Sequence, residues 1–265
     1  MQAIYYHVDA FTDRVFSGNP AGVCPLNSWL PDEILQKISA ENNLSETAYF
    51  VRNSNGHYDL RWFTPTVEVD LCGHATLATA HVLWKHEGES SKILTFQTKS
   101  GPLTVTREEK ELLALNFPVR LAKEIAEPGG LTQAFGLSDT PVWIGQTHDR
   151  FLVVFKSARE VLDAVPNFSS LAKFSPGRFI LSAAGENGID FVSRFFAPDA
   201  GVPEDPVTGS AHCTLIPYWA ERLGKTVLRA RQVSQRGGEL SCELLGDRVK
   251  IAGHAVTYSR GTIEF

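Results

Sequence analysis

The sequence contains one segment twice, and this internal repeat restricts the fold more than any other feature. The segment Trp62–Gly88, WFTPTVEVDLCGHATLATAHVLWKHEG, matches Arg194–Gly224, RFFAPDAGVPEDPVTGSAHCTLIPYWAERLG. Each copy has a Phe-x-Pro sequence, a turn, a glycine that opens a helical segment, and a second glycine 15 residues later. Repetition of a whole supersecondary unit predicts two structurally similar domains.

The helical segment of the first copy is apolar around nearly its whole circumference. A helix of this kind is expected to be buried inside a core. Most of the remaining chain consists of strand-like runs of aromatic and β-branched residues, separated by turn residues. We therefore predict an α+β fold of two pseudo-symmetric domains, each a curled, mostly antiparallel sheet or barrel around a central helix. The apolar residues of the first helix are Leu77, Ala78, Ala80, Val82, Leu83 and Trp84.

The junction between the two domains is expected at Leu115-Asn116-Phe117-Pro118, where a run of strands ends in a proline. Proline cannot donate a hydrogen bond to a continuing sheet, so it often marks the end of a strand. The first domain is accordingly expected to comprise residues 1–117, and the second to begin at residue 118.

Composition excludes several classes of function. The formal net charge is -5 and the pI is near 5.9, so no basic surface for nucleic acid or an anionic membrane is indicated. No apolar run approaches the roughly 20 residues that span a bilayer, and the first residues do not have the pattern of a secretory signal. The four cysteines are scattered, without a CxxC pair. A reduced, cytoplasmic protein is therefore expected.

Each helical segment opens with a glycine, Gly73 or Gly209, and we call this helix start the mouth of the helix. The first turn of a helix has free N–H groups and partial positive charge, and glycine lets a ligand approach the backbone. In the predicted architecture both mouths line the cleft between the domains. Ser210 adds a hydroxyl group and His74 an imidazole. Singly, these residues are explained by tight turns and an N-cap; their repetition favours a site for a small carboxylate.

Two carboxylates are candidate functional groups. Asp205 precedes the second mouth in EDPVTGS, although Asp-Pro also favours a turn. Glu46 begins the apolar run of NLSETAYF, where a glutamate is commonly a solvated edge residue; in a dry cleft it could instead transfer protons. The equivalent position in the second copy is expected around Ser182-Ala183-Ala184, which contains no carboxylate. We therefore expect a single base of this kind.

Other kinds of site are not indicated. Cys72 and His74 with His81, or His212 with Cys213, are metal-ligand types, but without CxxC or HExxH no metal site is predicted. Cys72 and His74 are also too close in sequence to be expected to face each other as a hydrolase pair. Neither GxGxxG nor GxxxxGK[ST] occurs, so no dinucleotide or triphosphate site is predicted.

Several motifs resemble those of the PhzF family of phenazine-biosynthesis-like isomerases, and more distantly the diaminopimelate-epimerase fold. These motifs are VDAFTDRVFSGNPAGV, NLSETAYF, DLCGHATLATAHVLW, LNFP and EDPVTGSAH, and they follow the family order over essentially the whole chain. The resemblance implies an active site between the domains, and a last strand near 256–265 that returns to the first domain, leaving 118–255 to the second. It also implies a homodimer, a small anionic metabolite as ligand, and neither an organic cofactor nor a metal.

The resemblance also implies roles for individual residues. Glu46 corresponds to the general acid/base, and His74 and Asp205 correspond to its partners. The implied substrate contacts are Ser45, Gly73, Gly209 and Ser210.

One departure from the epimerases of this fold is informative. Those enzymes have a cysteine before each mouth glycine, whereas this chain has Cys72 and Thr208. Inversion needs a base on each face, while one carboxylate suits a same-face proton shift. We therefore expect a cofactor-independent isomerase that moves a proton within a small cyclic or unsaturated carboxylic acid. The alternatives are an epimerase or racemase of an amino or hydroxy acid that uses Cys72, and a non-catalytic carboxylate-binding protein.

Overall fold

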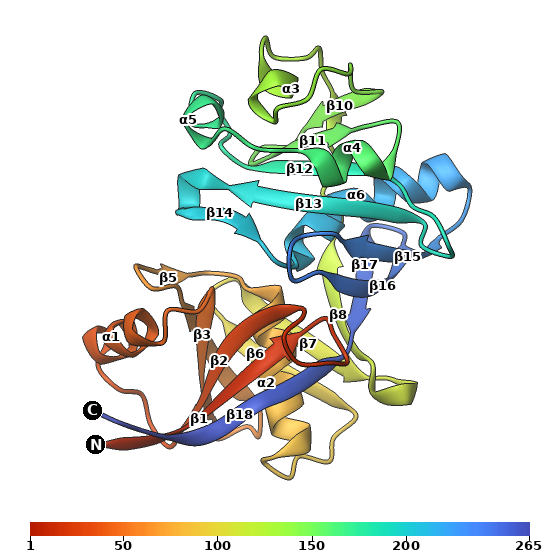
Figure 1. Cartoon of the computed structure of the whole chain (residues 1–265). Helices are drawn as coiled ribbons and strands as arrows, with labels where there is room; N and C mark the ends of the chain where they lie inside the picture. Colours follow the sequence, from red (N-terminus) through yellow and green to blue (C-terminus); the bar gives the residue numbers. More distant parts are fainter. The chain divides into compact units, whose positions relative to one another are not determined.

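The computed structural model describes residues 1–265 and divides the chain into two compact units (Figure 1). The first unit comprises Met1–Asn116 together with Ile251–Phe265, and the second comprises Phe117–Lys250. The chain thus enters the second unit within the LNFP segment and returns to the first unit before its last strand. No helix is both long enough and apolar enough to cross a membrane.

The first unit is a curled sheet with one helix inside it and one outside. Its last strand, β18, pairs with β1 along the whole of β1, so the two terminal strands are neighbours (Figure 1). The outer helix α1 packs its buried Leu35 and Ile38 with Tyr49 and Phe63 of the sheet. The elements are β1 Gln2–Ala10, β2 Asn19–Leu26, α1 Asp32–Asn42, β3 Glu46–Arg52, β4 Tyr58–Phe63, β5 Glu68–Val69, α2 Gly73–Lys85, β6 Ile93–Thr98, β7 Gly101–Arg107, η1 Glu109–Glu111, β8 Leu113–Pro118 (whose last two residues lie in the second unit) and β18 Ala255–Glu264.

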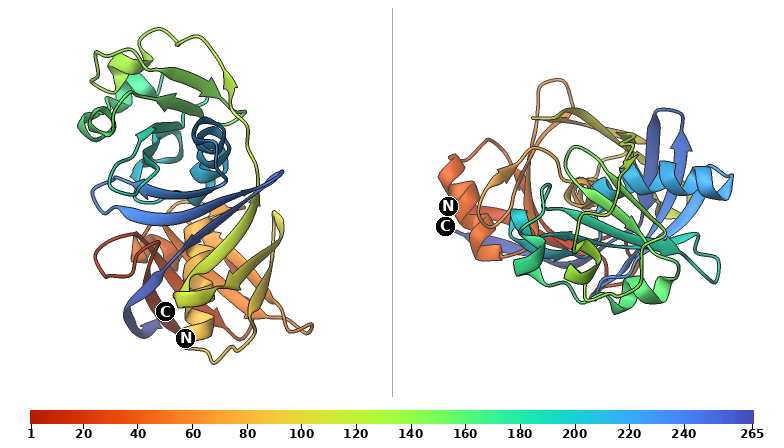
Figure 2. Two further views of the ribbon diagram at one scale, coloured as in Figure 1. Left: turned by 90° about the vertical axis from the view of Figure 1, so that its right-hand side faces the viewer. Right: turned by 90° about the horizontal axis from the view of Figure 1, so that it is seen from above.

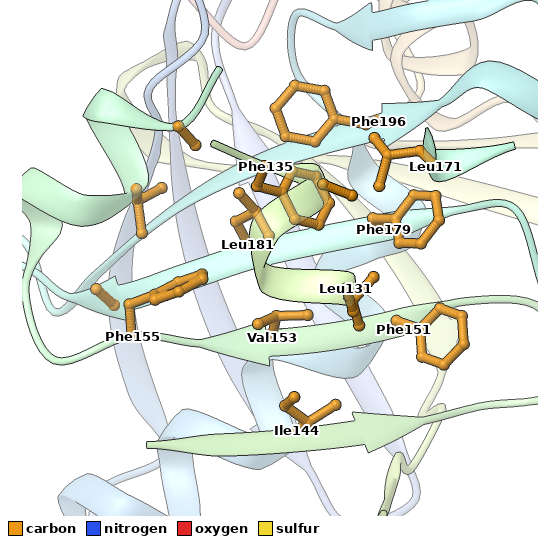
Figure 3. Close-up of a cluster of buried hydrophobic side chains, with 14 of the residues drawn as sticks. Leu131, Phe135, Ile144, Phe151, Val153, Phe155, Leu171, Phe179, Leu181 and Phe196 are labelled. Atoms are coloured by element: carbon orange, nitrogen blue, oxygen red, sulfur yellow. The ribbon is translucent and has the colours of Figure 1, made fainter. Parts of the chain in front are cut away.

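The second unit has the same sheet plan around its central helix α6, but three short helices, α3, α4 and α5, take the place of the single outer helix. On one face of its sheet, Phe135 after α3 packs against Phe179 and Phe196 of two adjacent strands, with Val153 and Leu181 beside them (Figure 3). The elements are β9 Lys123–Glu124, α3 Leu131–Ala134, β10 Trp143–Gln146, β11 Phe151–Val154, α4 Ala158–Asp163, α5 Phe168–Leu171, β12 Phe179–Ala184, β13 Phe191–Ala197, η2 Pro198–Ala200, β14 Val202–Asp205, α6 Gly209–Leu223, β15 Val227–Gln232, β16 Gly238–Leu245 and β17 Arg248–Gly253 (whose last three residues lie in the first unit).

The strand pairing has the same order and direction in both units, which confirms the repeat found in the sequence. The antiparallel pairs β1–β2, β3–β4 and β6–β7 correspond to β10–β11, β12–β13 and β15–β16. The parallel pairs β2–β3 and β4–β6 correspond to β11–β12 and β13–β15. The predicted α+β fold of two similar, mostly antiparallel curled sheets is therefore confirmed.

Each central helix is buried, as its apolar composition predicts. In α2 every residue from His74 to Ala80 is buried, and the helix packs on β1, β2 and β3 inside the curled sheet (Figure 2). In α6 the buried run extends from Ala211 to Pro217, and this helix packs on β15 and β16. Trp84 is the exception in α2: it is half-buried, and its indole N–H donates to the carbonyl of Ser91.

Helix α6 ends at the glycine that the sequence indicates, with Gly224 as its C-cap. Helix α2 ends earlier than its glycine indicates, at Lys85 with His86 as its C-cap. Gly224 has φ 63° directly after α6, and Gly88 has φ 73°. Beyond the C-cap His86, the N–H of Glu89 donates to the Leu83 carbonyl at 3.1 Å. A residue with a side chain would be strained at either glycine position.

Pro217 interrupts the hydrogen bonds of α6, and the chain compensates nearby. Proline has no N–H, so the carbonyl of Cys213, one turn earlier, loses its usual helical partner. The N–H of Arg120 donates to this carbonyl at 3.0 Å. A buried carbonyl therefore stays paired, and the segment after β8 is fixed to the central helix of its own unit.

His81 of α2 and His86, the C-cap of the same helix, join the helix to the last strand. His81 Nε2 lies 2.9 Å from Thr257 Oγ1, and His86 Nε2 lies 2.8 Å from the same hydroxyl. Burial, with the positive charges that His86 and Lys85 can carry, lowers the pKa of His81 to about 4. An unfolded histidine has a pKa near 6.5, so between these values the unfolded chain binds more protons than the folded chain.

This difference predicts an acid-sensitive contribution to folding. The stability that His81 contributes, roughly 2–3 kcal/mol, should be complete above pH 6.5 and should be lost as the pH falls towards 4. Thermal unfolding of wild type and His81→Gln, followed by circular dichroism, should show a difference that changes across this interval. The exposed His57→Gln is the matched control, and an unchanged difference between wild type and His81→Gln would contradict the prediction.

Candidate active site

Glu46, Cys72 and His74 come together at the mouth of α2. His74 Nε2 lies 3.1 Å from Glu46 Oε2, and Cys72 Sγ lies 3.5 Å from His74 Nδ1. Asn19 approaches the same Nδ1 atom with its side-chain amide nitrogen at 3.2 Å. The imidazole thus has its two nitrogens in different surroundings, with a carboxylate at one and an amide and a thiol at the other.

Strand pairing explains why these residues meet. Strand β3 runs parallel to β2, and Glu46, its first residue, is the partner of Ala21, two residues after Asn19. Helix α2 packs on both strands, so its first turn reaches the same end of the sheet. Side chains that are distant in sequence are therefore brought to one point by the parallel pairing.

The contact between Cys72 and His74 corrects the expectation that these residues would not face each other. Cys72 is the N-cap of α2 and has an extended backbone, with φ -142° and ψ 108°. An N-cap side chain turns back over the first turn of its helix, which directs the Cys72 thiol towards the second helical residue. The expectation was wrong because it treated both residues as part of a regular helix.

The electrostatics of this mouth favour a charged imidazole and a neutral thiol. Burial, followed by the nearby Glu46 carboxylate, raises the pKa of Cys72 to about 11. Burial alone would lower the pKa of His74, but attraction to Cys72 and Glu46 outweighs it and holds the pKa well above its usual value. Because the thiol stays protonated at neutral pH, Glu46 is the anion that acts on His74 there. Glu46 and His74 therefore form an ion pair.

Thr208, Asp205 and Gln232 form a hydrogen-bonded network at the mouth of α6. The Thr208 hydroxyl donates to Asp205 Oδ2 at 2.5 Å, and the Gln232 amide donates to the Asp205 carbonyl at 2.6 Å. The Thr208 N–H donates to Gln232 Oε1 at 2.8 Å. The position that holds Cys72 in the first unit thus holds a hydroxyl that orients a carboxylate.

Arg150 is a residue of this second mouth that the sequence did not reveal. Its side chain is only 3% exposed, and its Nη1 donates to Ser210 Oγ at 3.2 Å. Asp149 accepts from Arg150 at both carboxylate oxygens, at 3.0 and 2.6 Å, and also pairs with Arg120 at 3.1 Å. Burial would raise the pKa of Asp149, but the hydrogen bonds and charge of Arg150, with Arg120, hold it below its usual range.

This network has chemical consequences for Ser210. The Arg120 and Arg150 guanidinium groups outnumber the Asp149 carboxylate that they share, and Asp205 provides a separate carboxylate at the same mouth. Because Ser210 Oγ accepts a hydrogen bond from Arg150, its own hydroxyl proton remains available to donate. The second mouth thus presents a hydroxyl donor with a buried guanidinium directly behind it, which suit an anionic oxygen.

The predicted site residues therefore fall into two groups, one in each unit. Gly73 opens α2, and Ser45 is half-buried directly before Glu46. Gly209 opens α6 and is buried. No cluster of lysines, arginines or glycines in the sequence marks Arg150, and Asn19 reads only as part of the turn SGNP. Either residue could have been assigned to the site only with knowledge of which strands pair.

The register of the strands also corrects the position that corresponds to Glu46 in the second unit. Thr47 pairs with Phe63, and Phe179 pairs with Phe196, the equivalent phenylalanine of the repeat. Glu46 therefore corresponds to Arg178 rather than to a residue around Ser182-Ala183-Ala184. The expectation of no carboxylate at this position holds.

Comparison with known proteins places these observations in one family. The family model described as "Phenazine biosynthesis-like protein" (PhzC-PhzF) matches residues 8–261. An uncharacterized isomerase of Pseudomonas aeruginosa is 52% identical and covers 99% of both chains. The crystal structure of a PhzF-family phenazine biosynthesis protein of Enterococcus faecalis has TM-score 0.95 and 44% identity and covers 100% of both chains. A hydroxyproline epimerase of Agrobacterium vitis, at 9% identity and TM-score 0.62 over 99% of this chain and 92% of its own, shares the fold.

Proposed function

Because the chain belongs to the PhzC-PhzF family of phenazine biosynthesis-like proteins and is an isomerase of the PhzF-like class, we propose that Glu46 is its catalytic acid and base. The reaction we propose is a cofactor-independent proton shift within a small cyclic or unsaturated carboxylic acid. One observation carries this proposal: Glu46 forms a 3.1 Å ion pair with a buried imidazole while its own side chain stays 17% exposed. A carboxylate of this kind is oriented, ionised and accessible to a ligand.

The proposed proton transfer uses the two carboxylate oxygens differently. Glu46 Oε2 faces His74 Nε2, which leaves Oε1 to accept a proton from an acidic carbon of the substrate. Glu46 then returns this proton to another carbon on the same face, and the double bond moves. The positively charged imidazole stabilises the carboxylate before Glu46 takes the proton and again after Glu46 returns it, and the Asn19 side-chain amide lies 3.2 Å from the other ring nitrogen. A positioned group of this type contributes typically 10²–10⁴-fold to a rate.

The second mouth supplies substrate binding in this proposal. The Gly209 N–H and the Ser210 hydroxyl donate to the carboxylate of a small anionic metabolite, with Arg150 behind Ser210. Asp205, oriented by Thr208, assists proton transfer as the partner of Glu46 and His74. Ser45 and Gly73 contact the substrate at the first mouth. We propose that the protein acts in the cytoplasm as a homodimer. Light scattering of the purified chain would test the dimer.

The test of the proposal is a search for turnover in deuterated water. Small cyclic and unsaturated carboxylic acids are incubated with the enzyme, and ¹H NMR follows each carbon-bound proton. The expected result is movement of a double bond, with the proton removed from one face of the substrate and returned to the same face. Inversion at one carbon without movement of a double bond would instead establish an epimerase, and no turnover of any member would contradict the proposed substrate class.

The alternative of a thiol-dependent epimerase has one observation in its favour, the 3.5 Å contact of Cys72 with His74. Its burial argues against it, because a thiol with pKa near 11 provides little thiolate at neutral pH. We therefore expect Cys72→Ala to retain activity within about tenfold, a loss of at most 1.4 kcal/mol in transition-state stabilisation. Steady-state kinetics on the acid identified above would check this, and a loss beyond 100-fold would restore the thiol as a base. The other alternative, a non-catalytic carboxylate-binding protein, does not agree with the isomerase class.

A further inference from the structure

The mouth of α2 contains three different kinds of metal ligand at one point. A carboxylate oxygen of Glu46, the sulfur of Cys72 and a ring nitrogen of His74 all lie within 4.8 Å of one another. Thiolate, imidazole and carboxylate are the ligands that zinc prefers in proteins. We propose that these three side chains bind one thiophilic divalent cation, with zinc the best fit, and that the bound cation switches the enzyme off.

The distances between the ligand atoms support this site. Zinc lies about 2.3 Å from sulfur and about 2.0–2.2 Å from nitrogen or oxygen, so a tetrahedral ion separates its ligands by roughly 3.3–3.6 Å. In the structure His74 Nε2 lies 3.1 Å from Glu46 Oε2 and 4.0 Å from Cys72 Sγ. Small side-chain rotations would bring these separations to the values that the ion requires.

Burial and access are divided among the three ligands in a useful way. Cys72 and His74 are 6% and 5% exposed, so their positions are held by packing. The Glu46 side chain is 17% exposed, so it is the ligand that solvent reaches most readily. Asn19 Nδ2 lies 3.2 Å from Nδ1 of His74, so Nε2 is the nitrogen available to the metal. With Nε2 bound to the metal, Nδ1 carries a proton, and the Asn19 amide would turn its oxygen towards Nδ1 to accept its hydrogen bond.

The charge of the cluster also balances on binding. Before binding, the Glu46 carboxylate is negative, His74 is positive and the Cys72 thiol is neutral. Binding forms metal–sulfur, metal–nitrogen and metal–oxygen bonds and releases the thiol proton and one imidazole proton to solvent. The divalent cation replaces these two protons, so the net charge of the buried cluster does not change. No oxidant or reductant is needed.

The second unit lacks this donor set at the equivalent place. Thr208 and Ser210 stand where Cys72 and His74 stand in the first unit, and neither hydroxyl is a strong ligand for zinc. The nearby His212 bonds the Thr208 carbonyl through Nδ1 at 2.8 Å and is fully buried. The repeated fold thus provides one metal site rather than two, and sequence motifs could not indicate it because Glu46 is 26 residues before Cys72.

Cobalt chloride is the direct probe of this site, because a four-coordinate Co²⁺–thiolate complex has intense visible bands and a sulfur-to-metal charge-transfer band. The full chain, reduced and freed of metal by chelator, is titrated with Co²⁺ and then with Zn²⁺. The expected result is one cobalt per chain with both spectral features, displaced by one equivalent of zinc. A spectrum that remains that of hydrated cobalt would overturn the proposal.

Variants separate this site from adventitious binding. Cys72→Ser should lose the charge-transfer band and weaken zinc binding at least about 100-fold, more than loss of a supporting contact usually costs. Glu46→Gln should keep the band and weaken binding less, which provides a second reading if Cys72→Ser unfolds. Cys242→Ser, a buried cysteine elsewhere, is the matched control. Unchanged zinc affinity in both Cys72→Ser and Glu46→Gln would place the metal elsewhere and refute the site.

Inhibition is a separate reading and rests on the proposed function of Glu46. In an active preparation, zinc at one equivalent should stop turnover, and chelator should restore it. If cobalt binds with the expected bands but zinc does not inhibit an active enzyme, the metal site stands and the proposed inhibition by the cation is wrong. Activity of Glu46→Gln would refute the proposed function while the spectra still decide the metal site.

Discussion

Glu46→Gln is expected to lower kcat for isomerisation by about 10²–10⁴-fold while changing KM little. The amide has nearly the shape of the carboxylate, so its oxygen can take the place of Oε2 beside His74 Nε2. It cannot accept a proton from carbon at neutral pH. The loss therefore falls on the chemical step rather than on folding or binding, and ¹H NMR in deuterated water should show solvent exchange at the reacting carbon lost in parallel.

The control for this variant is Glu41→Gln, an exposed glutamate near the end of α1. It removes the same charge from the same unit without touching the mouth of α2, and we expect wild-type kinetics. Circular dichroism and thermal unfolding of both variants establish that they are folded. Full activity of Glu46→Gln would show that another group moves the proton.

Arg150→Gln is expected to weaken binding of the substrate carboxylate by about 10–100-fold, or about 1.4–2.7 kcal/mol, with a smaller effect on kcat. The guanidinium is buried and donates to Ser210, and its Nε and Nη2 atoms donate to the two carboxylate oxygens of Asp149. Glutamine can keep one hydrogen bond but removes the positive charge behind the mouth of α6. Steady-state kinetics should show the change mainly in KM.

The same substitution should also reduce stability, because it leaves the partly buried Asp149 with Arg120 as its remaining cation. Breaking a buried ion pair typically costs about 3–5 kcal/mol, so kinetics must be measured well below the unfolding transition. Arg150→Lys keeps the positive charge but lacks the planar guanidinium that donates to both oxygens of Asp149. Its KM and its stability should therefore lie between those of wild type and Arg150→Gln. The exposed Arg159→Gln, which loses only a surface pair with Asp163, is the control. If Arg150→Gln and Arg150→Lys lose equal stability and both keep the wild-type KM, Arg150 has a structural role and does not contribute to substrate binding.

Some features of the site were predictable because they depend on neighbouring residues in the chain. In each copy the glycine that opens the helix, the apolar body of the helix and a second glycine beyond its end follow one another within 16 residues. Local backbone preference and apolar periodicity specify such elements. The same reasoning failed for Cys72 and His74, because the N-cap is not helical and its side chain turns back.

The repeat, the two central helices and their glycine mouths were thus determined by the sequence itself, because each depends only on residues that are neighbours in the chain. Which side chains meet at those mouths was decided by the tertiary structure. Glu46 reaches His74 across 28 residues, and Arg150 reaches Ser210 across 60. The first meeting depends on the parallel pair β2–β3 and on the packing of α2 against both strands. The second depends on where α6 packs within the sheet of its own unit. Parallel pairing joins distant segments, and its register follows from the packing of the whole unit rather than from any local pattern.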